Sequence, residues 1–355
     1  MSGADPNLNL RRRRLPGLVA MAAAIPLRPL LGLLRRKNDP EAPPWIFASY
    51  MVGDLFMALP ALKRLGSGLP VRVLCRPDCA ELLRREGFDA VPFDNAFFAR
   101  RTPGALVSTL RAAWRLRRLP VSAALDLDAD PRTALWMRVA GVPRIVSFRR
   151  PYGVLFDETF ELPATAIHQA EKDEAVVDAW MRQNGGRRTK DEESSRTTYR
   201  LGSSPSAPSS PWLLSVWTRK PQKNWPLERW DIFLERLTTR GVPFAILDAP
   251  DGDAAFRSFR ARWRDRAEFV SGPLEFVMER VKSSAGVVAT DNFLGHMGGA
   301  CGKSVLWINV CSPAAQVEPR GPRTLRVGDG APERPSSPTV DAAWSRFLEL
   351  SAPSA

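Results

Sequence analysis

Two carboxylates and a lysine occupy positions in the sequence where transfer chemistry could take place. Asp54 follows a glycine just after a short apolar run, and Asp291 directly follows a second such run. Lys223 lies in a basic segment between Trp217 and Pro226, after a third run. A positioned aspartate can take a proton from an attacking hydroxyl, and a lysine can neutralise a diphosphate leaving group. The residue types predict transfer chemistry on a phosphorylated substrate.

Asp54 also has a purely structural interpretation. Aspartate is favoured at a helix start, where it accepts from free N–H groups. The helix dipole stabilises its ionised form and lowers its basicity, whereas an apolar wall from Phe56 and Met57 would raise its pKa. A helix cap and a general base both remain open for this residue.

The basic segment around Lys223 can be interpreted in two ways. Thr218 and Lys223 follow an apolar run and precede a predicted helix, where cations could replace a metal ion in stabilising a leaving group. The alternative is a solvated loop in which Trp225 and Trp230 anchor the chain to the core.

The segment Thr290–Ala300 opens a helix that is rich in small residues. Free N–H groups at such a start suit a phosphate, and Gly298 and Gly299 allow a close approach to the helix. The structural alternative is that Asp291 caps the helix and His296 is a packed histidine.

Short apolar runs alternate with segments of helical period from Trp45 onward, which predicts parallel strands covered by helices. Pro103 and Pro131 suit the first turn of a helix, and further helices are expected near Asp54 and Asp78. The expected strands of this half are Trp45–Ser49, Val71–Cys75, Ala90–Phe93, Ala123–Leu127 and Ile145–Phe148.

The stretch 185–211 interrupts this alternation. It is rich in Gly, Arg, Ser and Pro and lacks an apolar period, which is typical of a linker. The alternation then resumes, with helices expected near Pro226, Asp253, Pro273 and Leu294. The expected strands of this half are Leu213–Val216, Phe244–Leu247, Val287–Ala289 and Val305–Ile308.

The sequence therefore predicts an α/β protein with two Rossmann-like domains, whose parallel sheets face a central cleft. Ligands of such sheets bind at the carboxyl ends of the strands. A last helical pattern, Val340–Leu350, is expected to pack back across the domain boundary. The expected parts are an arm over 1–40, a domain over 41–184, the linker, a domain over 212–330, and a loop and helix over 331–355.

Composition limits the class of protein. A length of 355 residues suits two domains. The four cysteines lie mostly in apolar runs, which disfavours a disulfide framework and favours a reduced compartment. The two histidines form no zinc-ligand spacing with them, so we expect no metal.

The net charge of +13 indicates an anionic partner, unless it reflects arginine-rich coding. The partner would be nucleic acid, an acidic membrane surface or a phosphorylated substrate. No nucleic-acid-binding motif is present. The arm over 1–40 holds eight basic and two acidic residues, and its broken apolar stretch is too short to span a bilayer. Attachment to an anionic leaflet is favoured over a disordered arm or a cleaved signal. We expect a cytoplasmic protein, peripheral on the inner membrane.

Taken together, the three segments resemble glycosyltransferase family 9, the ADP-heptose:lipopolysaccharide heptosyltransferases. The likeness covers about residues 45–321, and a weaker match joins Asp126-Leu127 to Pro131–Leu135. The matching motifs are Gly53-Asp54 with Leu59-Pro60-Ala61-Leu62, Lys223-Asn224-Trp225-Pro226 with Trp230, and Asp291 with His296-Met297-Gly298-Gly299-Ala300.

This resemblance implies a GT-B fold and inverting, metal-independent transfer from a nucleotide sugar to an anionic glycolipid, without a cofactor. ADP-heptose is one candidate donor. Asp54 would be the catalytic base and Lys223 would bind the donor diphosphate, with Thr218 beside it. The backbone over Asn292–Leu294 would meet the phosphates. The other donor-binding positions implied are Asp291, Asn292, Phe293, His296 and Ser312, and the acceptor-binding candidates are Arg100, Arg101 and Arg111.

Three departures from the family pattern lie on the donor side. Phe293 stands where the family has glycine, Asn309-Val310-Cys311-Ser312 replaces F-G-P-T, and Asp248–Asp251 replaces G-G-P-E. They leave two alternatives open, a different donor and a catalytically silent relative that acts in binding or assembly. A Rossmann oxidoreductase is disfavoured because no G-x-G-x-x-G follows a first strand.

Overall fold

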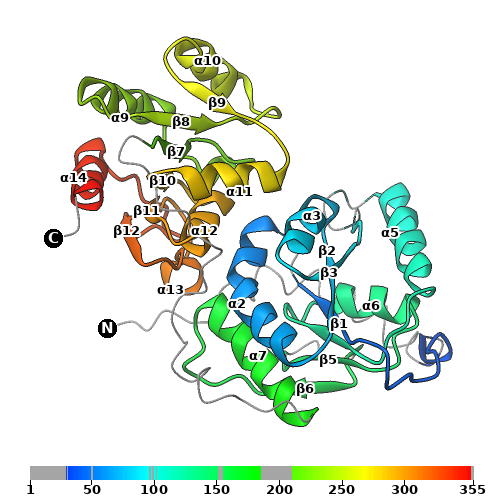
Figure 1. The fold of residues 1–355 in the computed structure, drawn as a ribbon. Helices are drawn as coiled ribbons and strands as arrows, with labels where there is room; N and C mark the ends of the chain where they lie inside the picture. The colour runs from blue at the N-terminus through cyan, green and yellow to red at the C-terminus, as the bar shows by residue number, and fades with distance from the viewer. Residues whose placement is uncertain are drawn as a thin grey trace. The chain divides into compact units, whose positions relative to one another are not determined.

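A computed structural model describes residues 29, 31–48, 51–95, 97, 100, 102–150, 155–184 and 210–352 (Figure 1). The chain divides into two compact units, one up to Thr189 and one from Lys190. Of the expected arm over 1–40, residues 1–28 and 30 lie outside the described residues. The expected linker also lies outside them, apart from its last two residues.

The first unit is a six-stranded parallel sheet with the order β3-β2-β1-β4-β5-β6. The chain moves outward from β1 to β3 and then returns to β4, and right-handed crossovers therefore place helices on both faces. Accordingly, α2 packs on α7, and α5 packs on α6. The strands are β1 (Trp45–Phe47), β2 (Arg72–Cys75), β3 (Asp89–Pro92), β4 (Ala124–Asp126), β5 (Ile145–Phe148) and β6 (Glu158–Phe160); the helices are α2 (Val52–Gly68), α3 (Pro77–Arg85), α5 (Pro103–Leu116), α6 (Pro131–Val139) and α7 (Gln169–Gln183).

The second unit repeats this topology, with the order β12-β11-β10-β7-β8-β9. The predicted α/β class with two parallel sheets is confirmed. The strands are β7 (Trp212–Ser215), β8 (Phe244–Leu247), β9 (Glu268–Val270), β10 (Gly286–Ala289), β11 (Ser304–Ile308) and β12 (Arg323–Val327); the helices are η2 (Pro221–Lys223), α9 (Leu227–Thr239), α10 (Ala254–Trp263), α11 (Leu274–Ser283), α12 (Phe293–Ala300), α13 (Ala314–Val317) and α14 (Val340–Ser351).

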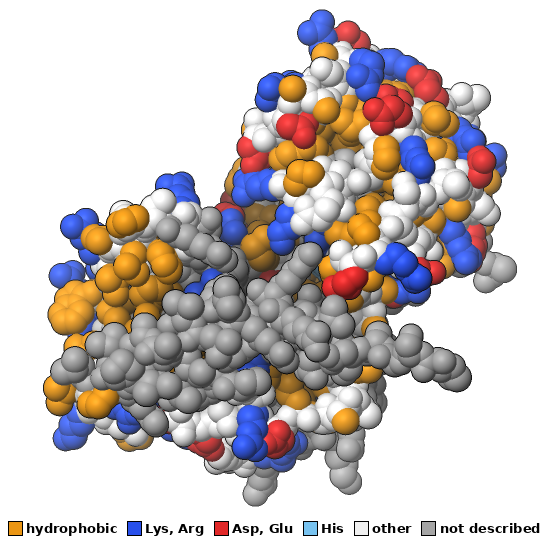
Figure 2. Space-filling view, turned by 180° about the vertical axis from the view of Figure 1, so that it is seen from behind, with side chains coloured by type: hydrophobic (Ala, Val, Ile, Leu, Met, Phe, Trp, Pro, Cys, Tyr) orange, Lys and Arg blue, Asp and Glu red, His pale blue; other side chains and the backbone are white. Residues whose placement is uncertain are grey.

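Basic side chains are spread over the face of both units that Figure 2 shows. In the first unit, several of them pair with carboxylates that belong to other elements. Arg64 of α2 lies 2.8 Å from Asp178 of α7, and the buried Arg138 of α6 lies 2.6 Å from Asp157. These pairs tie helices to the elements beside them.

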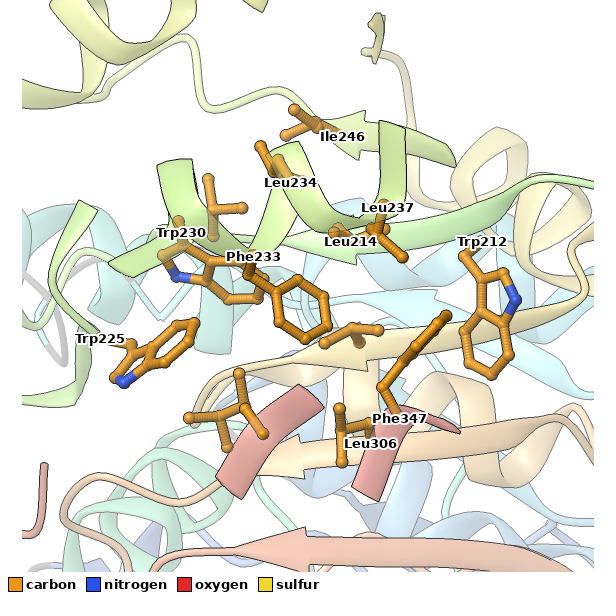
Figure 3. Packing of buried hydrophobic residues seen from close by; sticks show 14 of the residues in the cluster. Trp212, Leu214, Trp225, Trp230, Phe233, Leu234, Leu237, Ile246, Leu306 and Phe347 are labelled. Atoms are coloured by element: carbon orange, nitrogen blue, oxygen red, sulfur yellow. The ribbon is translucent and has the colours of Figure 1, made fainter. Parts of the chain in front are cut away.

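The core of the second unit is aromatic (Figure 3). Trp225 and Trp230 are fully buried, and their rings meet edge to face at 5.1 Å, as the prediction of Trp230 in the core requires. Phe347 of α14 enters the same cluster. This helix packs on α9, β11 and β12, which all belong to the second unit.

All four cysteines are buried, and none of them is in a disulfide bond. Burial raises the pKa of Cys75 to about 12, so this thiol is a poor nucleophile. In the described part of the chain, no group of three or more His, Cys, Asp or Glu side chains is placed to hold a metal ion. The described helices include none that is long and apolar enough to cross a bilayer.

Candidate functional site

Each sheet has a switch point between the two strands from which the chain runs outward in opposite directions. These strands are β1 and β4 in the first unit, and β7 and β10 in the second. Open parallel sheets bind ligands at the carboxyl ends of such strands. Asp54 and Lys223 follow β1 and β7, and Asp291 follows β10. The predicted residues therefore lie beside the two switch points.

The second unit brings Lys223, Asp291 and Ser312 together. Lys223 Nζ donates a hydrogen bond of 2.8 Å to Ser312 Oγ. Asp291 Oδ2 accepts one of 2.9 Å from the Cys311 N–H. These residues follow β7, β10 and β11, three neighbouring strands, so the group forms because the strands end at the same edge of the sheet.

Asp291 is 7% exposed. Burial raises the pKa of Asp291, while the Cys311 N–H and the positive charge of Lys223 act in the opposite direction. Its Oδ1 atom is buried and accepts no hydrogen bond from any described residue. Asp291 thus holds the loop after β11 and counterbalances the lysine. This arrangement suits recognition of an anion through Lys223.

The loop that carries Lys223 is held by Asn224, which the sequence analysis did not single out. Asn224 Oδ1 accepts from the Thr218 N–H at 2.7 Å, and Nδ2 donates to the Thr218 carbonyl at 3.1 Å. The Thr218 hydroxyl accepts from the Lys220 N–H at 3.0 Å. Thr218 therefore stabilises the loop, and the only sequence signal for Asn224 was its place before the buried Trp225.

Asn292 is the N-cap of α12, a position for which Asp291 was one candidate from the sequence. Asn292 Oδ1 accepts from the Leu294 N–H at 3.0 Å, and the Asn292 N–H donates to the Thr290 carbonyl at 2.7 Å. Two of the three N–H groups expected to meet phosphates are thus engaged within the chain. Phe293, which is half-buried, is the first residue of the helix.

Gly298 and Gly299 allow the close approach that their residue type predicted, but the partner is the chain itself. A Cβ on Gly299 would lie 2.2 Å from the Arg320 carbonyl oxygen, and one on Gly298 would lie 2.9 Å from Val287 Cγ2. Gly298 lets α12 pack closely on the sheet, and Gly299 lets it pack on the segment that precedes β12. His296 is half-buried on the same helix.

Asp54 lies in the first turn of α2 and is half-buried. The helix begins at Val52 with Met51 as its N-cap. Asp54 is therefore not the residue that opens the helix, as the capping interpretation assumed, although the dipole still favours its negative charge.

Further carboxyl groups lie around Asp54. Asp173 of α7 is buried, and burial raises its pKa well above the usual range, with the charges of Asp128 and Asp54 adding to the effect. The loop after β4 is shaped by Asp126, which is buried and accepts from the Asp128 N–H at 2.9 Å. Ala129 of this loop has a φ of 49°, in the left-handed region. Asp173 was missed because its position in a helical pattern gave no chemical signal.

Two of the three candidate acceptor-binding arginines lie among the described residues. Arg100 is exposed just before α5, and Arg111 is exposed two turns into that helix. Arg101 lies outside the described residues.

Two Rossmann-type units in one chain, each with its switch point between the first and fourth strands, correspond to the GT-B class of fold. The structure of E. coli heptosyltransferase WaaC with ADP is similar, with a TM-score of 0.66 and 15% identity over 87% of this chain and 99% of that chain. E. coli ADP-heptose lps heptosyltransferase II has a TM-score of 0.65 and 16% identity over 87% and 98%.

A third similar structure is the glycosyl transferase family 9 protein from Veillonella parvula, with a TM-score of 0.61 and 12% identity over 82% of this chain and 88% of that chain. No family model matches the sequence, and no curated protein does either. At these identities the likeness establishes the fold: the chain has the fold of the heptosyltransferases.

Proposed function

We propose that this protein is a glycosyltransferase that moves a sugar from a nucleotide sugar to an anionic glycolipid. The observation that carries the proposal is the group Lys223, Asp291 and Ser312 at the switch point of the second sheet. A half-buried lysine there is suited to a diphosphate, whose charge increases as the bond to the sugar breaks. Donor binding is thereby assigned to the second unit.

Acceptor activation is assigned to Asp54 in the first unit. In the proposed step, the Asp54 carboxylate takes the proton of an acceptor hydroxyl while that oxygen bonds to the anomeric carbon. The bond from this carbon to the diphosphate breaks, and the nucleoside diphosphate leaves with the electron pair. One displacement inverts the anomeric configuration. Lys223 supplies the positive charge in place of a metal ion.

ADP-heptose is the first donor to test, because two similar structures are of E. coli heptosyltransferase WaaC with ADP and with ADP-2-deoxy-2-fluoro heptose. The experiment incubates the full chain with a panel of nucleotide sugars and a solubilised anionic glycolipid, and follows nucleoside diphosphate release and product mass. Asp54→Asn should lower turnover by about 10²–10⁴-fold, the usual contribution of a general base. It should leave donor affinity unchanged.

Asp341→Asn is the matched control, because Asp341 also lies in the first turn of a helix, with an 84% exposed side chain. It should turn over like the wild type. Full turnover by Asp54→Asn would remove Asp54 from the mechanism.

Phe293 supports a second candidate, a binding or assembly protein without turnover. Its side chain stands at the start of α12, where the resemblance implies glycine, and Asn292 already engages the Leu294 N–H. Wild-type protein that binds a nucleotide sugar in calorimetry but transfers nothing to any glycolipid would favour this candidate.

A further inference from the structure

An exposed face of α5 combines large apolar and basic side chains. Trp114 is 56% exposed and Val107 is 44% exposed. Both lie on the same side of the helix as the exposed Arg111 and Arg115, and the exposed Arg118 lies just beyond the helix end. These five residues are defined here as the α5 face. Residues three, four and seven apart in a helix share one side. Hydrophobic side chains gather on the outer part of the first unit in Figure 2, with basic side chains beside them.

The segment 31–37 lies against the end of α5 and extends this surface. Arg36 donates to the Leu119 carbonyl at 2.7 Å and also to the Arg117 carbonyl. In return, Arg117 donates to the Leu34 carbonyl at 3.0 Å. The Arg117 guanidinium also lies 4.8 Å from the centre of the Trp114 ring. Segment 31–37 and Trp114 are therefore neighbours.

Leu33 in this segment is 81% exposed. A leucine and a tryptophan left this open on one side of a domain are costly in water, because apolar area gains free energy when it leaves water. The surface thus has the side chains that enter a lipid headgroup region, where the tryptophan ring and leucine are favoured.

The charge of this region is one-sided. Between Asp94 and Asp126 the sequence has six arginines and no acidic residue. Arg111, Arg115 and Arg118 form no ion pair with any described residue, unlike Arg64 and Arg138 elsewhere in the unit. Arg35 of segment 31–37 does pair with Asp157, at 2.6 Å. The positive charge of the three arginines on the α5 side complements the phosphates of an anionic leaflet.

The sequence that precedes residue 29 leads into segment 31–37. It contains Arg11–Arg14 followed by an apolar stretch, which is the composition of a segment that binds an anionic leaflet. The positive charge, the exposed apolar side chains and the sequence before residue 29 thus all favour an anionic bilayer as the partner of this surface.

We propose that the α5 face and segment 31–37 form a docking surface for an anionic lipid bilayer. Trp114, Val107 and Leu33 enter the headgroup region, and the arginines bind lipid phosphates. This proposal goes beyond sugar transfer, and it stands even if the protein transfers no sugar.

The test is co-sedimentation of the full chain with vesicles of phosphatidylcholine alone or mixed with an equal part of phosphatidylglycerol. Wild-type protein should bind only the mixed vesicles. Arg115→Gln combined with Arg118→Gln should weaken this binding by about thirtyfold. Leu33→Ser combined with Trp114→Ser should weaken it by about tenfold or more, because their apolar area no longer leaves water.

The matched control combines Ile232→Ser with Phe276→Ser, since these residues are 49% and 45% exposed in the second unit. Its binding should equal that of the wild type, and circular dichroism checks that all variants fold. Quenching of tryptophan fluorescence by brominated acyl chains should decrease in Trp114→Phe. The proposal would be overturned if both double variants kept wild-type affinity, or if the wild type bound neutral vesicles equally well. A soluble protein or RNA that binds the α5 face in preference to vesicles would also overturn it.

Discussion

Lys223 Nζ and Ser312 Oγ lie 2.8 Å apart, although 89 positions of sequence separate the two residues. Lys223 follows β7 and Ser312 follows β11, with β10 between these strands in the sheet. The hydrogen bond spans the switch point of the second sheet. It holds the lysine beside Asp291, and the positive charge of Lys223 acts to lower the pKa of that carboxyl group, against the effect of burial.

Lys223→Ala should weaken binding of the donor nucleotide sugar by about 1.5–3 kcal/mol, the contribution of a charge-assisted hydrogen bond. Titration calorimetry measures the change. Lys220→Ala is the control, because Lys220 belongs to the same loop but is exposed, and it should change the affinity little. Equal losses in the two variants would indicate a diffuse effect of charge and not a specific contact.

Asp173→Asn should make the stability of the first unit less dependent on pH. Burial raises the pKa of Asp173 above the ordinary value of 3.8, so above that value the folded chain binds more protons than the unfolded chain. Stability then decreases as pH rises toward the folded pKa. Asparagine carries no charge at any pH, so the variant does not show this loss. The Tm of Asp173→Asn should therefore exceed the wild-type Tm by a larger margin at alkaline pH than at acidic pH.

Thermal unfolding of both proteins at a series of acidic to alkaline pH values measures this difference in Tm. Asp265→Asn, in a side chain that is 84% exposed, should follow the wild-type curve. A parallel shift of the Asp173→Asn curve at every pH would mean that ionisation of Asp173 is not the cause.

Gly299→Ala should destabilise the second unit by about 1–3 kcal/mol, as overpacking does, because its Cβ would meet the Arg320 carbonyl oxygen. Gly104→Ala is the control in another helix, where a Cβ meets nothing within 4 Å. It should stabilise the protein by about 0.4–1 kcal/mol by restricting the unfolded chain. Denaturant unfolding compares the two, and similar midpoints would contradict the close packing of α12.

Trp225→Phe should cost more stability than Trp230→Phe, by about 0.5–1.5 kcal/mol. Both indoles are fully buried. Trp225 Nε1 donates to the Pro338 carbonyl at 2.8 Å, whereas Trp230 Nε1 has no partner among the described residues. The two variants remove the same atoms, so the difference in unfolding free energy compares a hydrogen-bonded indole N–H with a buried one that has no partner among the described residues. No difference would mean that this bond contributes nothing.

Much of the fold could be predicted from local signals. Pro103 and Pro131 begin helices where expected, and Ile145–Phe148 and Phe244–Leu247 are strands with the expected bounds. The strands that were missed, β6, β9 and β12, all lie at sheet edges. Such strands are only partly buried and carry charged residues, as Arg323–Val327 does, so they lack an apolar run.

The site was predictable to a lesser degree. Residues that follow a strand could be located, because strand ends are visible as apolar runs. The partners of these residues could not be predicted, because the contact of Lys223 with Ser312 depends on the order of strands in the sheet. Asp173 gave no signal, and Asn224 gave none beyond its place before Trp225, since an amide that holds a loop and a buried acid in a helix look like ordinary polar residues.

The paired hydrogen bonds of Arg36 and Arg117 determine where the protein can be shortened. A version that starts at Pro29 keeps both guanidinium groups and their carbonyl partners. Trimming to residue 40 would discard Arg36, and the carbonyl groups of Leu119 and Arg117 would each lose a donor. The shorter version should therefore unfold at a lower temperature, and crystallisation or expression work would do better with the longer one.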